Sequence, residues 1–168
     1  GVSGGRRAGL DRLGVGGGCG RGFGSICVNG VEVEANNAEF DIDEDSVGAS
    51  QSDLSVGDVV AVVFDTNSPD NALVVIGDEA VEGPIDSISV AASQIVVVGQ
   101  TVLIAASTSF DDSTGLNAIA DLQPGDFVEV SGFFDGDGHI RATRIERKPG
   151  AVEVEVHGVV EGKTATHV

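Results

Sequence analysis

The chain contains no Met, Trp or Tyr, and 9 of its 168 residues are Lys or Arg against 27 Asp and Glu, which gives a formal net charge of -18. This shortage of cations excludes nucleic acid as a general partner, because Lys and Arg supply most of the affinity for the phosphate backbone. It also argues against an anionic membrane surface. Apolar runs such as 95–98 are far shorter than the roughly 20 residues of a membrane-spanning helix. We therefore expect no nucleic acid partner and no membrane insertion.

The beginning of the chain lacks further features. Gly1 stands where an initiator Met would be, and neither a charged nor an apolar leader segment follows it. A mature product whose leader was removed on export has this appearance, as does a fragment of a longer protein. Hydrophobic residues make up 41% of the chain, which is too many for a disordered protein. The sequence predicts a folded, exported protein that is extracellular or at the cell surface.

The charges are unevenly distributed along the chain. Residues 1–21 have a net charge of +3, residues 22–140 carry 22 acidic side chains without a single Lys or Arg, and residues 141–168 have a net charge of +1. One interpretation is that the acidic body keeps the protein soluble and binds divalent cations diffusely. The other is that a basic end and an acidic body favour head-to-tail association, which forms a filament when the contact does not close into a ring.

Several segments of the body recur in the same order. The matching pairs are 53–60 with 121–128, 27–33 with 97–103, 40–41 with 110–111, and 81–86 with 156–161. Such ordered self-similarity predicts two copies of one unit.

Each unit is predicted to consist of strands. Residues 25–28 and 31–34 flank Asn29-Gly30, the preferred pair for a type I′ turn, and 95–98 and 101–104 flank Gly99-Gln100 in the same way. Further strands are expected at 59–64, 72–76, 127–134, 139–145 and 152–160, several with the alternation typical of half-buried strands. Residues 116–122 are the one stretch that favours a helix, which Pro124 would end.

A unit of this size buries little surface unless its sheet closes on itself. We therefore predict an all-β protein with two small β-barrels in tandem. The expected divisions are a Gly- and Arg-rich tail over 1–21, a first barrel over 22–80, a second over 81–150, and a C-terminal strand segment over 151–168.

The residues that fix these turns also carry a family resemblance. The chain resembles bacterial exported domain-of-unknown-function proteins with tandem OB-like barrels behind a Gly-rich N-terminus, over about residues 22–161. The motifs lie at 22–26, 28–31, 81–85, 122–126, 129–132 and 142–146. The resemblance implies OB-like barrels and export, and it carries over no enzymatic residues. The chain has no Cys at its start, so no lipid anchor is expected there.

The two ends suggest how the protein functions. Strand addition supplies main-chain hydrogen bonds along a sheet edge while alternate side chains fill pockets. We expect a non-enzymatic extracellular subunit that polymerises with copies of itself by donating a strand. The expected assembly residues are Arg6, Arg7, Arg12 and Arg21 in the tail, and Val152, Val154 and Val156 near the C-terminus. Alternatively, the C-terminal strand closes the second barrel, and the protein is a monomeric spacer or a module that binds saccharide or calcium.

Two candidate sites remain. Cys19 and Cys27 are the two cysteines and suit a disulfide in an exported protein, within the chain or between chains, although two free thiols are the other alternative. Asp135 and Asp137 begin a D-x-D-G pattern with Glu146 at the twelfth position, as in a calcium loop. A strand at 139–145 would carry Glu146 away, so a plain hairpin turn is favoured.

The remaining polar residues favour no particular chemistry. Asp65, Asn67 and Asp70 indicate a turn. The histidines, at 139, 157 and 167, have no metal-binding spacing, and no Gly-x-Ser-x-Gly motif occurs. We expect no enzymatic activity and no cofactor.

Overall fold

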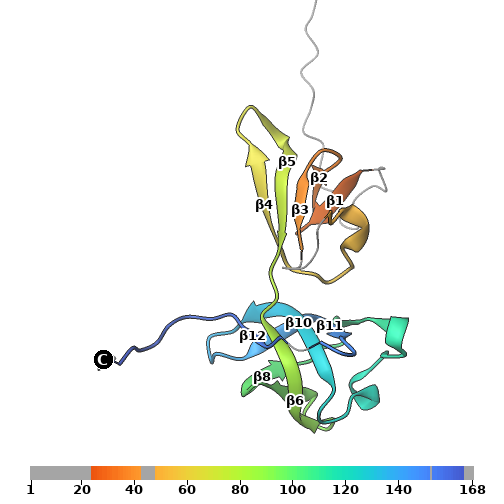
Figure 1. The fold of residues 1–168 in the computed structure, drawn as a ribbon, viewed down its shortest axis with the longest axis vertical. Coiled ribbons are helices and arrows are strands. Elements are labelled where there is room, and N and C mark those ends of the chain that lie inside the picture. The colour runs from red at the N-terminus through yellow and green to blue at the C-terminus, as the bar shows by residue number, and fades with distance from the viewer. Residues whose placement is uncertain (1–23, 43–47, 152, 165–168) are drawn as a thin grey trace, which may run out of the picture.

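The computed structural model describes residues 24–42, 48–151 and 153–164. They form two all-β units, one above the other in Figure 1, and no strand pairing joins the two sheets. The first unit holds β1 to β5 and the second holds β6 to β12. The chain passes from one to the other between Gly77, which ends β5, and Val81, which begins β6. Among the described residues, no helix is long and apolar enough to cross a membrane.

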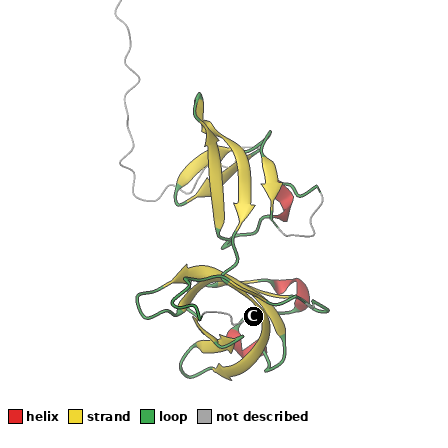
Figure 2. Cartoon of the chain, turned by 60° about the vertical axis from the view of Figure 1, so that its left-hand side comes forward, coloured by secondary structure: helices red, strands yellow, loops and turns green. Residues whose placement is uncertain are grey.

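The second unit is a closed barrel (Figure 2). Its strands pair in the order β6-β7-β8-β11-β10, and β10 pairs with β6 to close the ring. The OB-fold is likewise a small barrel of five strands. The all-β prediction is confirmed, and so is a closed barrel in the second half of the chain. The five strands are β6 (Val81–Ser89), β7 (Gln94–Val97), β8 (Gln100–Leu103), β10 (Phe127–Phe134) and β11 (Ile140–Arg147).

The interior of this barrel is packed with branched aliphatic side chains, which suit a pleated surface. Every strand of the ring contributes at least one side chain that is 2% exposed or less. Two short strands lie outside the ring: β9 (Ser109–Phe110) runs parallel to β11, and β12 (Glu155–Val156) runs antiparallel to β6. Beyond β12 the chain runs away from the barrel (Figure 1).

The first unit is an open sheet within the described residues. Its strands are β1 (Ser25–Val28), β2 (Val31–Glu34), β3 (Glu39–Asp41), β4 (Val60–Asp65) and β5 (Ser68–Gly77). They pair in the order β1-β2-β5-β3, with β4 on the other side of β5. A smaller core of Val33, Ala35, Ala72 and Val75 packs beneath the sheet. Closure of the first predicted barrel is not confirmed.

The two units share their pairing pattern. Val62 lies opposite Val75 in the first unit, and Val130 lies opposite Ile145 in the second. Just beyond these pairs, both hairpins have a register shift, so that Phe64 faces Ala72 as Gly132 faces Ala142. The strands β1, β2, β3, β4 and β5 therefore take the places of β7, β8, β9, β10 and β11.

The predicted turns are correct in one hairpin and displaced in the other. Asn29 and Gly30 have φ of 51° and 79°, as a type I′ turn requires. In the second unit the turn residues are Val98 and Gly99, at 49° and 75°, one position before the predicted pair. Gly99 N donates a 2.8 Å hydrogen bond to the Asp86 carboxylate, which stabilises this displaced turn.

Two other predictions were wrong. Instead of a helix over 116–122 there is a single 3-10 turn, Ile119–Asp121. The reason is that the Asp121 carboxylate accepts hydrogen bonds from Asn117 N and Ala118 N, both at 3.0 Å, and holds Ala118 extended. The connection between the strands predicted at 59–64 and 72–76 is shorter than expected, because β5 already begins at Ser68 and includes Asp70.

Candidate functional site

Within the residues that the structure describes, the first unit differs from the second by one strand position. In the second unit β6 lies between β7 and β10, pairing with both. The corresponding strands of the first unit are β1 and β4, and no strand among the described residues lies between them. We call this position the strand gap.

The side chains that border the strand gap are incompletely buried. In the second unit, the inward-facing residues beside β6 are fully buried, at 0% exposed. Their counterparts in the first unit are only partly buried, and nearby Phe64 is 40% exposed. Burying apolar area contributes about 25 cal/mol per Å², so a strand placed here would stabilise the unit. The counterpart pairs are Ile26 with Ile95, Val28 with Val97, Val60 with Val128, and Val62 with Val130.

Cys27 lies on β1, beside the strand gap, and its side chain is exposed on the outer face. It is disulfide-bonded. Cys19, the other cysteine of the chain, lies outside the described residues, as do the predicted assembly residues Arg6, Arg7, Arg12 and Arg21.

A row of four glutamates crosses the second unit. Glu146 on β11 lies opposite Glu129 on β10, which lies opposite Glu82 on β6, and Glu82 in turn lies opposite Glu155 on β12. Like charges directly opposite one another destabilise a sheet. We call these residues the glutamate row.

Each end of the glutamate row is met by a basic side chain. Lys148 Nζ lies 2.7 Å from Glu129 Oε2 and 3.8 Å from Glu146 Oε1. Even so, burial raises the pKa of Glu129 to about 7. At the other end, His157 contacts Glu155 at 2.5 Å and Asp78 at 3.0 Å. The hydrogen bond with Glu155 is the main reason why the pKa of His157 is raised.

The glutamate row faces the junction of the two units. An open cleft of about 900 Å³ lies there, and its lining includes Glu79, Glu82, Glu146, Glu155 and His157. Acidic side chains outnumber basic ones in the lining, which contains Arg147 and Lys148 as well. Acidic side chains do not by themselves define a metal site, and we assign none.

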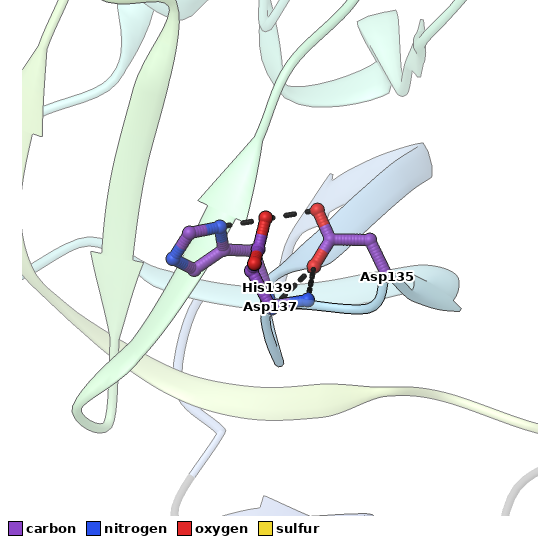
Figure 3. Close-up of side chains that lie close together, drawn as sticks. All are labelled: Asp135, Asp137 and His139. Carbon is purple, nitrogen blue, oxygen red and sulfur yellow. Dashed lines mark hydrogen bonds and ion pairs between the residues drawn. The ribbon is translucent and has the colours of Figure 1, made fainter.

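The residues that resemble a calcium loop form a hairpin turn, the interpretation that the sequence favours. Asp135 Oδ1 accepts hydrogen bonds from Asp137 N at 2.9 Å and His139 N at 3.0 Å. Figure 3 shows the three side chains gathered at this turn, with ligand atoms within 4.8 Å of one another. The hydrogen bond from His139 N is the main cause that lowers the pKa of Asp135. Glu146 lies at the far end of β11, in the glutamate row, so the residues of a complete calcium loop do not meet.

The remaining candidate residues lie in a turn, near the C-terminus or outside the described residues. Asp65 accepts a 2.8 Å bond from Asn67 N, as expected of a turn. Val154 and Val156 are about half exposed, and Val156 pairs with β6 of its own chain, in agreement with the alternative that this segment belongs to the second barrel. Val152 and His167 lie outside the described residues.

Comparison with known proteins assigns one part of the chain. Residues 82–146 match a domain of unknown function, DUF5666. The DUF5666 match begins at Glu82 in β6 and ends at Glu146 in β11, so it spans the closed ring and leaves out β12. No curated protein and no solved structure matches the chain significantly.

Sequence reasoning missed both the strand gap and the glutamate row. The row depends on the registers of three different strand pairs, which the sequence does not contain. A signal for the gap did exist: the segments that match in the two units begin at residue 27 in the first, so 81–89 has no matched segment there.

Proposed function

We propose that the protein is a non-enzymatic, extracellular structural subunit that polymerises with copies of itself by β-strand addition. The strand gap of one copy takes up a strand from the N-terminal tail of a neighbouring copy. The observation that carries the proposal is the contrast between the closed DUF5666 ring and the first sheet, which share their pairing pattern but differ by one strand within the described part of the chain.

The physical chemistry of sheet edges supports the proposal. A strand between β1 and β4 would gain main-chain hydrogen bonds along its length, and its alternate side chains would complete the core. An open edge otherwise invites non-specific pairing. In exchanged assemblies, one element passes between identical subunits, and little new contact surface is needed.

The charge distribution supports the same partner. Residues 24–80, which contain the strand gap, include no Lys or Arg, whereas residues 1–21 carry four Arg against one Asp. Opposite charges speed the encounter of two partners and suppress wrong ones. An acidic body would also keep subunits from associating sideways at low salt.

The proposal also includes a tandem repeat, a bacterial origin and export. The common pairing pattern of the two units favours their origin as tandem copies of one OB-like unit. Bacterial origin and export follow from the resemblance of the sequence to exported proteins with such repeats.

Negative-stain electron microscopy of the intact protein tests the proposal. We expect regular fibres that survive mild detergent, and discrete particles from a variant that lacks residues 1–21. A variant with Arg6, Arg7, Arg12 and Arg21 replaced by Gln keeps the tail and should form fibres more slowly. Discrete two-lobed monomers from the intact protein at all concentrations would overturn the proposal.

One observation favours a second candidate function, saccharide binding. Phe133 and Phe134 are 57% and 43% exposed at the end of β10, and Phe133 lies opposite Arg141. An exposed aromatic ring beside a cation, such as Phe133 beside Arg141, can stack on and bind a sugar, and OB-folds include oligosaccharide binders. A glycan array probed with the intact protein and with Phe133→Ala tests this candidate. Signal that the substitution abolishes would support it, and an array without signal would contradict it.

A further inference from the structure

The strand gap has a defined register, because the second unit shows how its occupant would pair. On one side, β6 pairs Ser87 with Val96 of β7. On the other side, it pairs Val81 with Val130 and Gly83 with Val128 of β10. The occupant of the gap would make the equivalent contacts with β1 and β4.

The disulfide of Cys27 then fixes which segment fits. Cys27 occupies the position of Val96, since Val28 lies opposite Val31 as Val97 lies opposite Gln100. The residue facing Cys27 across the gap therefore takes the place of Ser87. Directly opposed residues on antiparallel strands have Cα atoms about 4.5–5.5 Å apart, which lies within the disulfide range. Cys27 is disulfide-bonded, and Cys19 is the one other cysteine.

We propose that residues 13–19 are the strand that fills the gap, antiparallel to both β1 and β4, with Cys19 opposite Cys27 and bonded to it. The inference rests on the proposed function only in the question of which copy supplies the tail, because an exchanged strand makes the same contacts in its own chain and in a neighbour.

The alternation of the tail agrees with this register. With Cys19 in the place of Ser87, Leu13 takes the place of Val81, which is buried in β6. Val15 takes the place of Gly83, which lies opposite Val128 and has a φ of 155°, so Val15 would need an ordinary extended backbone there. The intervening Gly14 takes the place of Glu82 on the outer face. The two large apolar side chains of 13–19 thus point into the core beside Val60 and Val62, which are now only partly buried. Shifting the register by one residue would turn both outward.

Engineered cysteine pairs in the intact protein test the register. In a background with Cys19→Ser and Cys27→Ser, the pair Gly14→Cys with Ala61→Cys brings two outward-facing, directly opposed residues together. The control pair, Gly16→Cys with Ala61→Cys, is two residues out of register. After mild oxidation we expect at least about tenfold more cross-linked product from the first pair, since a two-residue shift exceeds disulfide reach. Equal yields, or none from either pair, would overturn the inference.

The size of the cross-linked product tests the strand register and the polymer separately. A ladder of multimers on a non-reducing gel supports both. A cross-link within single chains supports the register and contradicts the polymer. Peptide mapping of the unmodified protein gives a second measurement that does not depend on engineered residues. A linked Cys19–Cys27 peptide is expected, and two free thiols would contradict the inference.

Discussion

Arg144 of β11 reaches across the junction of the two units, where its Nε lies 3.2 Å from Asp58 Oδ1 in the loop before β4. The same side chain lies 3.8 Å from Asp111 and 3.5 Å from Glu146. It is mostly buried, and so is Asp58. Because Arg144 Nε makes no aligned hydrogen bond, the contact is an ion pair. Arg144 thus links the first unit to the DUF5666 barrel.

Replacing Arg144 should destabilise the protein. Arg144→Ala leaves the carboxylates of Asp58 and Asp111 in a partly buried site without their cation, which costs about 2–4 kcal/mol. Urea unfolding at pH 7 measures the effect. The matched control is Arg141→Ala, because Arg141 pairs with Asp135 at 3.7 Å but is 70% exposed, and exposed pairs contribute under about 1 kcal/mol. Equal losses in the two variants would contradict this role for Arg144.

The junction also depends on Gly57. A Cβ on Gly57 would lie 2.7 Å from the Thr143 carbonyl oxygen, and Gly57 has φ of 103°. Gly30 has a positive φ as well, but open space surrounds it. We expect Gly30→Ala to cost about 1 kcal/mol from backbone strain and Gly57→Ala to cost about 1–3 kcal/mol more from the clash. Thermal unfolding of both variants would show the difference, and similar midpoints would argue against close packing at the junction.

Stability should fall as the pH rises through neutrality. The pKa of Glu129 is raised from 4.5 to about 7 by burial, so the folded state binds a proton that the unfolded state has released. The stabilisation is fully present below about pH 4.5 and is lost as the pH rises past 7. Linkage gives at most about 3 kcal/mol for this shift. The raised pKa of His157 changes stability in the same direction.

Substitution isolates the contribution of Glu129. The slope of unfolding free energy against pH between 5.5 and 8 should flatten in Glu129→Gln and remain unchanged in Glu153→Gln, an exposed glutamate. An unchanged slope in Glu129→Gln would show that the carboxyl is ionised throughout this range.

We expect the turn at Asp135 to stabilise the fold and not to bind calcium. Asp135→Ala removes the acceptor of two main-chain hydrogen bonds, so it should lower the thermal midpoint more than Asp137→Ala, whose side chain is exposed. Millimolar calcium should shift the midpoint of the unmodified protein and of Asp137→Ala equally. A calcium-induced shift that Asp137→Ala abolishes would restore the metal-site interpretation.

The sequence predicts turns and strands better than it predicts whether a sheet closes into a barrel. Asn29-Gly30 specifies its turn because both residues tolerate positive φ, and alternation identifies the flanking strands. Val98 was missed because a β-branched residue disfavours positive φ; the hydrogen bond from Gly99 to Asp86, 13 residues away, helps to hold the turn there. The helix predicted before Pro124 failed because the Asp121 carboxylate captures two main-chain groups, a competition that residue propensities do not include.

The candidate site was foreseen only in part. The basic tail and the cysteine pair were visible in the sequence, whereas the place where a strand could dock was not. That place emerges only when β1 and β4 are compared with β7 and β10. The glutamate row likewise brings together residues from 82 to 155 through pairings between distant strands.

Hydrogen exchange of β4 tests the central claim most directly. If residues 13–19 fill the strand gap, the amides of Val60 and Val62, which point away from β5, are protected in the intact protein. Leu13→Asp with Val15→Asp should then expose them and speed exchange at least about tenfold. The matched control, Val2→Asp with Leu10→Asp, alters the same tail outside that segment and should leave exchange unchanged. Identical exchange of β4 in all three proteins would contradict the account.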